Sequence, residues 1–321
     1  MLNTNIFFNL VDPNKDIVVA FSGGSDSSAL LNFCYELKQS KTFLGRLSAI
    51  HVNHNVSKNS DLWEEHCKNF CNTREIPLCC KKIIVNSKKA GLESAARKGR
   101  YKIFEQYLSP NDQLLLAHHA DDVAETILYR LFRGTGLDGL QGPLPSRQLG
   151  AGVLIRPWLS YPKSMLSEYL RQKSIEFVAD ESNERVDQDR NFIRNEILDL
   201  VSNRWPKAGL QIQQTSQLIS QHMKVYESLL DSQFGDILLQ PNLERNLLID
   251  LDTKTCAEVI RYWIKNNGVA MPNKKILQEI MKAFIYSHPT AKTKVNWSRA
   301  DKEQSGAFLS FCGGDLVINK K

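Results

Sequence analysis

The fold of this chain is decided by residues 16–27, whose sequence is DIVVAFSGGSDS. Residues 17–21 form an apolar run with β-branched members, which is typical of a buried strand. Two glycines with flanking serines follow at once, and residues 28–37 then have apolar side chains at helical spacing. This order predicts a strand, a tight loop and a helix, the first unit of an α/β domain.

The alternation of strand and helix continues along the chain. Further strands are expected at residues 47–52, 78–85, 113–117 and 153–155, and helices at residues 62–70, 92–108 and 123–132. The strand segments are nearly continuously apolar, as in strands that are buried on both faces. We therefore expect an α/β domain with a parallel sheet that is covered by helices on both faces.

The character of the sequence changes after about residue 205. Residues 210–229 contain no Pro or Gly and have apolar residues at helical spacing, which predicts a connecting helix. Farther on, helices are expected at 257–265 and 275–284 and a terminal strand at 307–311. We expect three parts: a larger domain at 1–205, a connecting helix at 206–230, and a smaller, mostly helical domain at 231–321.

The composition is that of a folded globular protein. The chain has 321 residues, of which 42% are hydrophobic and 24% charged, so extensive disorder and fibrous folds are excluded. No apolar stretch approaches the ~20 residues that span a bilayer. The N-terminus has no basic run followed by an apolar run, so we expect no secretory signal, no membrane partner and a cytoplasmic location.

The seven cysteines are expected to be reduced, because their number is odd and no export signal is present. Cys67 and Cys71 are four residues apart, with Cys79 and Cys80 nearby, and such a group can bind a metal. Paired C-x-x-C spacing is missing, however, so packing in the core is the favoured interpretation.

The positive charge is concentrated in one segment. The whole chain has 41 Lys and Arg against 35 Asp and Glu, whereas residues 81–102 have eight basic side chains against the single acid Glu93. This segment forms either a solvated helical face or a patch that binds phosphates or a nucleic acid backbone.

The loop at residues 22–27, SGGSDS, has the composition of an anion-binding site. Glycines let backbone N–H groups turn toward a ligand, serines add hydroxyl donors, and the following helix contributes the partial positive charge of its N-terminus. Asp26 does not suit such a site unless a cation such as Mg²⁺ lies between its carboxylate and phosphate oxygens. The structural alternative is a tight turn with a helix N-cap.

A second glycine motif has another interpretation. Residues 134–139, GTGLDG, match G-x-G-x-x-G, but they follow the expected helix at 123–132 and not a strand. A dinucleotide-binding turn needs the strand, so we expect a helix C-terminus and a loop here. A P-loop motif does not occur in the sequence.

Residues 118–126, HHADDVAET, form the second candidate site. If the helix has begun by Asp121, then Asp122 and Glu125 share one face, as do Asp121 and Glu125. Paired carboxylates can hold Mg²⁺, a substrate ammonium group or both, or they can simply complement the helix dipole. Taken alone, the paired His and Asp residues also suggest a metallohydrolase.

These segments are expected to converge. The loop at 22–27, the segment HVNH at 51–54 and the segment at 118–125 all follow predicted strands, and ligands of open parallel sheets bind at the carboxyl ends of strands. Arg97 and Arg100 precede the fourth strand and can reach the same crevice, where guanidinium groups suit charge on a phosphate.

The motifs together resemble a known family. SGGSDS resembles the pyrophosphate-binding loop of the N-type ATP pyrophosphatase superfamily, which has an adenine nucleotide alpha-hydrolase-like fold. The narrower motifs are residues 96–101 (ARKGRY), 118–126, 133–137 (RGTGL), 139–140 (GL), 156–159 (RPWL), 180–183 (DESN), 190–194 (RNFIR), 261–263 (RYW) and 271–272 (MP). This combination resembles the tRNA(Ile)-lysidine synthetase family.

The resemblance implies an ATP-dependent ligase. Free L-lysine would replace the C2 oxygen of the wobble cytidine in a tRNA(Ile) with a CAU anticodon, and ATP would become AMP and pyrophosphate. Residues 1–205 would be the ATP-pyrophosphatase catalytic domain and residues 231–321 a tRNA-recognition domain, in a homodimer. Adenylation of the unreactive C2 carbonyl oxygen creates a leaving group that the lysine amine can displace.

The resemblance also implies residue roles. ATP would be bound by Ser22, Gly23, Gly24, Ser25, Asp26 and Ser27. The catalytic residues would be Asp26, Arg97, Asp122 and Glu125, with Arg97 at the α-phosphate and with Asp122 and Glu125 holding lysine. Mg²⁺ would be bound by Asp26 and Glu125. Secondary candidates are Arg100, His118, His119 and Asp121.

The chain departs from the family pattern at two places. Many members have a further C-terminal domain, and this chain stops just after residues 316–318, so it is either a shorter form or a truncated one. In addition, Asn55 stands where the family often has Gly, and no role is assigned to His51 or His54.

Two other functions stay open at this point. A tRNA 2-thiolase of the same superfamily would use cysteines to carry sulfur or an iron–sulfur cluster, and the missing C-x-x-C pair disfavours it. A non-catalytic, nucleotide-sensing RNA-binding module would bind ATP without turnover.

Overall fold

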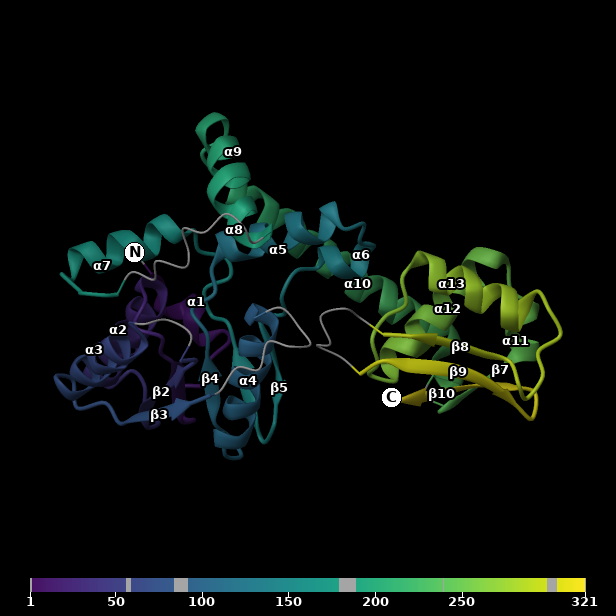
Figure 1. The fold of residues 1–321 in the computed structure, drawn as a ribbon, viewed down its shortest axis with the longest axis horizontal. Helices are drawn as coiled ribbons and strands as arrows, with labels where there is room; N and C mark the ends of the chain where they lie inside the picture. The colour runs from purple at the N-terminus through teal and green to yellow at the C-terminus, as the bar shows by residue number, and fades with distance from the viewer. Residues whose placement is uncertain are drawn as a thin grey trace. The chain divides into compact units, whose positions relative to one another are not determined.

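The structure, a computed structural model, describes residues 2–55, 59–83, 92–178, 189–238, 240–298 and 305–320. The chain divides into two compact units, Met1–Ser220 and Gln221–Lys321. Each unit has its own hydrophobic core. In Figure 1 the first unit runs from purple to green and the second from green to yellow.

The first unit contains a six-stranded sheet in the order β3-β2-β1-β4-β6-β5. Its strands are β1 (Ile17–Ala20), β2 (Leu47–Asn53), β3 (Leu78–Lys82), β4 (Gln113–Leu115), β5 (Ser146–Leu149) and β6 (Gly152–Ile155). All neighbours pair in parallel except β5, which pairs with β6 in an antiparallel manner. The predicted parallel sheet is confirmed, and the edge strand β5 was not predicted.

Helices cover both faces of this sheet. α1 (Thr4–Phe8), α2 (Ser25–Gln39), α3 (Ser60–Asn72) and α7 (Lys163–Gln172) pack on one face, and α4 (Leu92–Tyr107) packs on the other. The other helices that begin in the first unit are α5 (Ala120–Phe132), α6 (Leu137–Leu140), α8 (Asp189–Phe192), the π-helix η3 (Ile193–Leu198), α9 (Asp199–Arg204) and α10 (Ala208–Leu238). Side chains of β1 alternate between the faces: Ile17 and Val19 pack in the core with α2 and α7, whereas Val18 packs with Phe104 of α4.

The strand order reverses between β1 and β4. The chain passes from β1 outward to β2 and β3, then returns to β4 on the other side of β1. Ligands of doubly wound sheets bind at the carboxyl ends of strands at this kind of switch point. The SGGSDS loop (residues 22–27) follows β1 and residues 116–119 follow β4, so the topology brings both candidate segments to the switch point (Figure 1).

The SGGSDS loop is held in one shape by its own side chains and by its neighbours. The hydroxyl oxygen of Ser27 accepts a hydrogen bond from Ser22 N at 3.2 Å and lies 3.0 Å from Ser22 Oγ. Gly23 has a φ of +85°, a left-handed conformation that favours glycine. Its carbonyl accepts a hydrogen bond from Val178 N at 2.9 Å. The loop leads directly into α2, which begins at Ser25 with Gly24 as N-cap.

The glycines after α5 have the predicted role. The helix ends at Phe132, and Gly134 follows in the left-handed region with a φ of +72°. A glycine in this conformation is a common way to end a helix. The match of residues 134–139 to a dinucleotide motif is thus a helix end and a short loop that leads into α6 (Leu137–Leu140).

The second unit combines helices with a four-stranded antiparallel sheet in the order β7-β10-β9-β8. Its elements are β7 (Asn242–Glu244), α11 (Arg245–Ile249), α12 (Thr253–Asn266), α13 (Lys274–Ile280), the π-helix η4 (Met281–Ile285), β8 (Lys294–Trp297), β9 (Ala307–Cys312) and β10 (Asp315–Lys320). Of its strands only β9 was predicted, because at least half of the residues of β7, β8 and β10 are polar.

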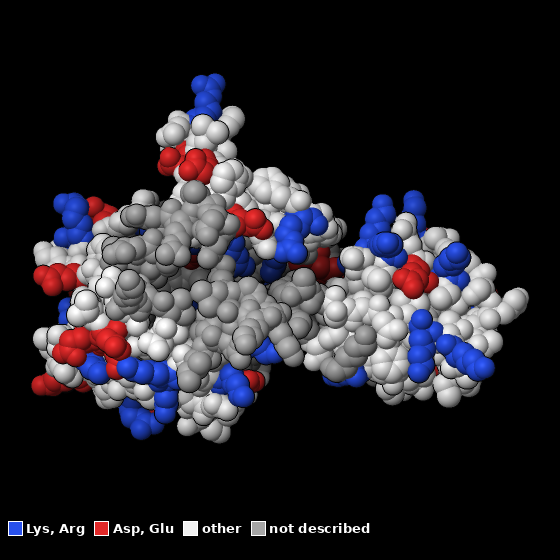
Figure 2. Space-filling view, viewed as in Figure 1, with Lys and Arg blue, Asp and Glu red and all other residues white. Residues whose placement is uncertain are grey.

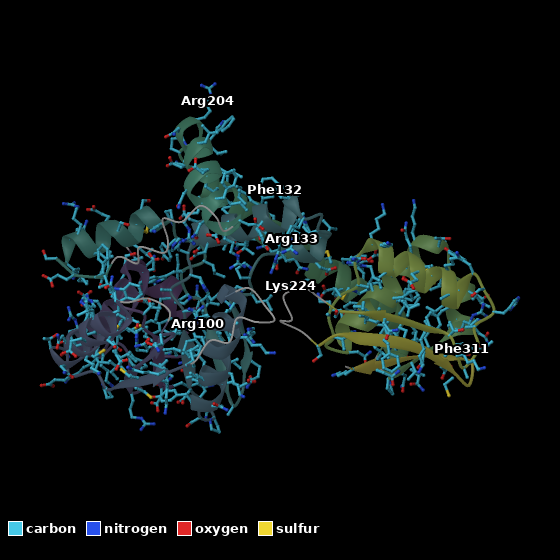
Figure 3. The ribbon with its side chains drawn as sticks, in the orientation of Figure 1. Arg100, Phe132, Arg133, Arg204, Lys224 and Phe311 are labelled. Atoms are coloured by element: carbon cyan, nitrogen blue, oxygen red, sulfur yellow. The ribbon has the colours of Figure 1, made fainter. Side chains whose placement is uncertain are left out.

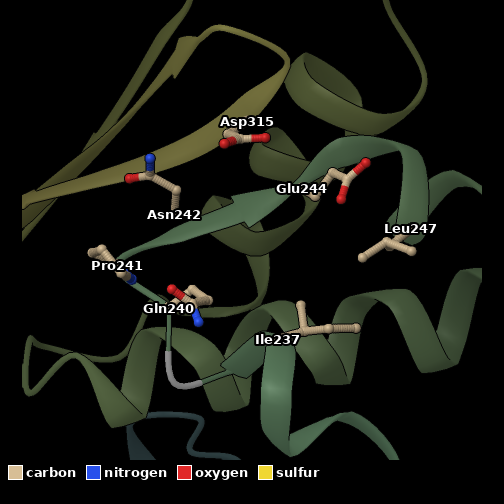
Figure 4. Close-up of a pocket in the computed structure, with 7 residues that line it drawn as sticks. All are labelled: Ile237, Gln240, Pro241, Asn242, Glu244, Leu247 and Asp315. Carbon is tan, nitrogen blue, oxygen red and sulfur yellow. The ribbon is translucent and has the colours of Figure 1, made fainter.

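One pocket of the second unit has a volume of about 300 Å³ (Figure 4). Glu244 of β7 and Asp315 of β10 line it together with Ile237 and Leu247. Two carboxylates disfavour a phosphate ligand at this place.

Within the described residues, no helix is both long enough and apolar enough to cross a membrane.

The shape of the loop predicts the effect of Gly23→Ala. A Cβ atom at Gly23 would lie 2.9 Å from Val178 Cγ2 and 3.0 Å from Cys67 Sγ, whereas a Cβ at Gly134 meets nothing within 4 Å. Both substitutions place a side chain at positive φ, which costs about 1 kcal/mol. We expect Gly23→Ala to lower the free energy of unfolding by about 1–3 kcal/mol more than Gly134→Ala, because only Gly23 also clashes. Equal losses in urea unfolding would contradict this packing.

Candidate active site

The two candidate segments meet at His119, the residue just before α5. Its Nε2 lies 3.6 Å from Asp26 Oδ2 of the SGGSDS loop and 3.5 Å from Asp122 Oδ2. Its Nδ1 lies 3.5 Å from Asp121 Oδ2. The expected convergence of the SGGSDS loop and the acidic helix start is therefore present, and a histidine that was only a secondary candidate joins them.

His119 has the charge state of a buried cation. Burial would lower the pKa of this imidazole, because only 4% of His119 is exposed, but the three carboxylates outweigh burial and raise its pKa to about 10. The ring is thus protonated at neutral pH. Its Nδ1 is buried and makes no hydrogen bond with any residue that the structure describes.

Asp26 is the acidic member of the loop. Burial would raise the pKa of its carboxyl group, yet the charges of His119 and Lys163 hold this pKa below its ordinary value. Asp26 is therefore a carboxylate at neutral pH, at the N-terminus of α2. Among the described residues no group of three or more His, Cys, Asp or Glu could hold a metal ion. A single carboxylate suits Mg²⁺, which is often bound through one or two carboxylates, substrate phosphates and water.

The acids at the start of α5 also have structural roles. Asp122 Oδ2 accepts a hydrogen bond from His119 N at 2.9 Å, and Asp121 Oδ2 accepts one from Lys163 N, the first residue of α7, at 2.7 Å. Asp121 thus caps a second helix N-terminus. These acids therefore stabilise helix N-termini, which is the structural role that the sequence left open for them. Asp122 also faces His119.

Glu125 is paired with Arg194, a residue for which the sequence predicted no role. Arg194 donates from Nε at 3.0 Å and from Nη2 at 2.6 Å to Glu125 Oε2, and its Nη2 lies 3.8 Å from Asp122 Oδ1. Arg190 Nε lies 4.0 Å from Glu125 Oε1. One face of α5 therefore presents Asp122 and Glu125 to the same cation, as the helical spacing predicts.

Glu125 is a buried carboxyl group beside two arginines. Only 5% of this residue is exposed, and burial raises the pKa of its carboxyl group despite the attraction of Arg194. Arg190 and Arg194 are four residues apart at the junction of α8 and η3. This i, i+4 spacing in the RNFIR motif was a signal that both arginines share a face. π-Helical turns such as η3 are rare and frequently occur at functional sites.

A group of basic residues lies beside the acidic one. Arg97 Nη2 donates to the Tyr101 hydroxyl at 3.3 Å, and its guanidinium lies over the Tyr101 ring at 4.9 Å. Arg156, the residue after β6, donates from Nε to His118 Nδ1 at 3.0 Å. Burial and the charges of Arg156, Arg97 and Arg100 hold the pKa of His118 far below its ordinary value, so this imidazole is neutral. Figure 3 labels Arg100 in this part of the first unit.

The histidines at the end of β2 differ in their surroundings. His51 donates from Nδ1 to the Phe21 carbonyl at 2.9 Å, which ties β2 to the residue before the SGGSDS loop. His54 Nδ1 is buried without a hydrogen bond to a described residue, and burial together with the charge of Arg100 lowers its pKa to about 4. Asn55 has a φ of +51°, which explains why glycine suits this position.

The cysteines near the site are protonated thiols. Burial raises the pKa of Cys67 above its ordinary value and that of Cys71 to about 12. Neither is a reactive thiolate at neutral pH. Cys67 packs against the SGGSDS loop, and its Sγ lies 3.4 Å from His51 Nδ1. Both contacts agree with a role in the core.

Some sequence features lie outside the described residues. These are the motif at 180–183, the last two residues of the strand expected at 78–85 and, within the basic segment, Lys88 and Lys89. The remaining candidates from the sequence are described, and those of the SGGSDS loop, α4 and α5 all belong to the first unit.

Comparison with known proteins gives the family. Residues 3–201 match the model of the PP-loop domain, and residues 243–304 match the TilS substrate binding domain. The fold of the first unit is shared with the U34-tRNA thiolase NcsA from Methanococcus maripaludis, with a TM-score of 0.54 at 17% identity over 68% of this chain and 78% of that one. At this identity the likeness concerns the fold alone.

Curated relatives cover nearly the whole chain. The tRNA(Ile)-lysidine synthase of Legionella pneumophila (strain Lens) is 35% identical over 307 residues, which are 94% of this chain and 70% of that protein. The enzyme of the same name from Serratia proteamaculans is 34% identical over 88% of this chain and 65% of that protein. With both domain matches in the expected order, the chain belongs to the tRNA(Ile)-lysidine synthase family.

Proposed function

We propose that this protein forms lysidine at the wobble cytidine of a CAU-anticodon tRNA(Ile), with ATP as the activating substrate and free L-lysine as the nucleophile. Membership of the family supports the activity. The contact of His119 with Asp26 on one side and with Asp122 on the other carries the assignment of the site, because it joins the SGGSDS loop to the acidic face of α5.

In the first step, the cytosine C2 oxygen attacks the α-phosphorus of ATP and pyrophosphate leaves. We assign binding of the pyrophosphate to the backbone and hydroxyl groups of residues 22–27 at the N-terminus of α2. Arg97, on the basic side, is assigned to the α-phosphate, where a guanidinium stabilises the developing negative charge. Asp26 would hold Mg²⁺, which when bound would supply positive charge for the pyrophosphate.

In the second step, the lysine ε-amine attacks C2 and AMP leaves with the former C2 oxygen. The incoming ammonium group must first lose a proton, and carboxylates both bind the cation and accept a proton. We assign this role to Asp122 and Glu125, which already face the guanidinium of Arg194. This use of Glu125 leaves Asp26 as the better supported Mg²⁺ ligand of the two.

The second unit is proposed to bind the tRNA. Residues 221–321 contain 14 Lys and Arg against 11 Asp and Glu. Figure 2 shows several separate blue side chains on the visible face of this unit and a single red patch among them. Such a surface favours a polyanion.

A homodimer stays a proposal from the family resemblance, to be measured by sedimentation.

The 2-thiolase alternative is less supported. Such an enzyme needs cysteines that carry sulfur or a cluster, whereas Cys67 and Cys71 are protonated core thiols. The sharing of a fold with a thiolase does not decide the reaction, because one fold hosts several chemistries. An iron and persulfide assay on the purified protein separates the two functions.

The central experiment measures the product. Purified protein is incubated with labelled lysine, ATP and the CAU-anticodon tRNA(Ile) transcript, followed by nucleoside analysis. We expect label in the wobble nucleoside and one pyrophosphate per lysine incorporated. Binding of ATP without any product would support the nucleotide-sensing module instead.

The loop carboxylate is tested by Asp26→Ala in the same assay. We expect pyrophosphate release to fall by at least about 100-fold, because the variant loses a group placed at the phosphates, while the Kd of the tRNA stays within a factor of about two. The matched control is Asp61→Ala, which removes an exposed carboxylate of α3 that pairs with Lys82. Normal turnover of the Asp26 variant would remove this residue from the site.

The lysine site is tested by Glu125→Gln. We expect the KM for lysine to rise about 10-fold or more, since a charge-assisted contact becomes a neutral one, with little change in the KM for ATP. Thermal unfolding is measured in parallel, because Arg194 loses its partner. Equal changes in both KM values would argue against a lysine-specific role.

The role of His119 as a cation has a pH signature. Its pKa rises from an ordinary 6.5 to about 10 on folding, so its stabilising contribution is complete below pH 6.5 and is lost as the pH rises toward 10. Without added Mg²⁺, we expect His119→Gln to lower the free energy of unfolding by about 2–4 kcal/mol at pH 6. The gap to the parent protein should narrow steadily toward pH 10. A gap that does not depend on pH would show that the ring is neutral.

A further inference from the structure

Arg156 is a buried cation that makes no ion pair with any acid of the described residues. Only 5% of this residue is exposed. Its guanidinium donates to His118 Nδ1 at 3.0 Å, to the Leu144 carbonyl at 2.7 Å and to the Tyr101 hydroxyl at 3.4 Å. All three acceptors are neutral, and no carboxylate of the described residues pairs with Arg156. Burial of an unpaired charge is costly, so this arrangement needs a reason beyond stability.

The hydrogen bond from Arg156 decides which nitrogen of His118 has the proton. Arginine can only donate, so His118 Nδ1 must be the acceptor, and the proton of the neutral ring lies on Nε2. Within the described part of the chain, Nε2 makes no hydrogen bond. His118 follows β4, whose carboxyl end lies at the switch point of the sheet. The residue is therefore a fixed neutral donor and not a general base.

The same reasoning applies to Tyr101. Its hydroxyl oxygen accepts from Arg156 Nη2 and from Arg97 Nη2, so its own proton is directed elsewhere. No described residue accepts that proton. Nε and Nη2 form the edge of a guanidinium that commonly binds both oxygens of a carboxylate. Here that edge holds two side chains, each with a hydrogen left to donate.

Further positive charge surrounds these donors. The guanidiniums of Arg97 and Arg147 lie 4.9 Å and 5.2 Å from the centre of the Tyr101 ring. Although burial opposes it, the charges of Arg97, Arg156 and Arg100 lower the pKa of the Tyr101 hydroxyl. Arg147 belongs to β5, at the edge of the sheet, so the basic group extends outward from β4 across β6.

We propose that His118 Nε2–H and the Tyr101 hydroxyl, both oriented by Arg156, form a binding site for a phosphate group beside the SGGSDS loop. Arg156 is the positioning residue of this site, and its charge is compensated when the anion binds. One donor, His118, follows β4, which is the strand next to β1, and the other, Tyr101, belongs to α4. Arg156 follows β6, so the site lies on the β6 side of the SGGSDS loop.

The ligand is a phosphate from one of two sources, and this part of the inference rests on the proposed function. One source is a phosphodiester of the substrate RNA next to the target cytidine, and the other is the α-phosphate of ATP. The two sources are separated by binding measurements with the CAU-anticodon tRNA transcript and with ATP, each in the absence of the other.

The test is Tyr101→Phe, which removes one donor and keeps the ring, with Tyr107→Phe as matched control on the same helix. Loss of one hydrogen bond to a charged ligand weakens binding about 10- to 100-fold. An increase of this size in the Kd of the tRNA alone assigns the site to the RNA, and an increase in the Kd of ATP alone assigns it to the nucleotide. Unchanged Kd values for both ligands in Tyr101→Phe would overturn the proposal, even where the parent protein forms lysidine normally.

The positioning role of Arg156 has a separate readout. ¹⁵N NMR of the His118 ring at pH 7 should show a neutral imidazole with the proton on Nε2. In Arg156→Gln we expect a mixture of tautomers, since glutamine can accept as well as donate. An Nδ1–H tautomer or an imidazolium at His118 in the parent protein would contradict the proposed donor, whatever the effect of the variant on folding.

Discussion

The arrangement of the site depends on one buried imidazolium. Three carboxylates, Asp26, Asp121 and Asp122, surround His119 at the carboxyl ends of β1 and β4. Carboxylates gathered in a partly buried space repel one another, and a cation among them turns this repulsion into attraction. His119 therefore holds the SGGSDS loop against the start of α5, and the proposed phosphate and cation sites both depend on that contact.

The carboxylates at this edge of the sheet lie on one side, together with their cationic partners His119 and Arg194. The side near β1 and α5 contains Asp26, Asp122 and Glu125, whereas the side near α4 and β6 contains Arg97 and Arg156. His118 and His119 are adjacent in sequence, yet one is neutral and the other charged. A reaction that brings an ammonium group to an adenylated base needs both kinds of surface at once, because the two reactants have opposite charges.

The fold sets limits on function without choosing one. A doubly wound sheet offers a ligand site at its switch point, and the first unit shares its fold with a thiolase. The chemistry is distinguished by local features: protonated core cysteines, an acidic face on α5 and a second unit that matches a substrate-binding domain. These features favour a ligase that acts on tRNA.

The sequence by itself determined the parallel sheet, the loop after β1 and the shared face of Asp122 and Glu125, because these depend on local periodicity and spacing. Strands such as β5 and β8 could not be predicted, since at least half of their residues are polar. Only the tertiary structure decided the partners of these titratable groups: Arg194 for Glu125, Arg156 for His118 and Asp26 for His119. Such pairs join residues that are distant in the chain, and their pKa values depend on burial and neighbours, which spacing along the sequence does not specify.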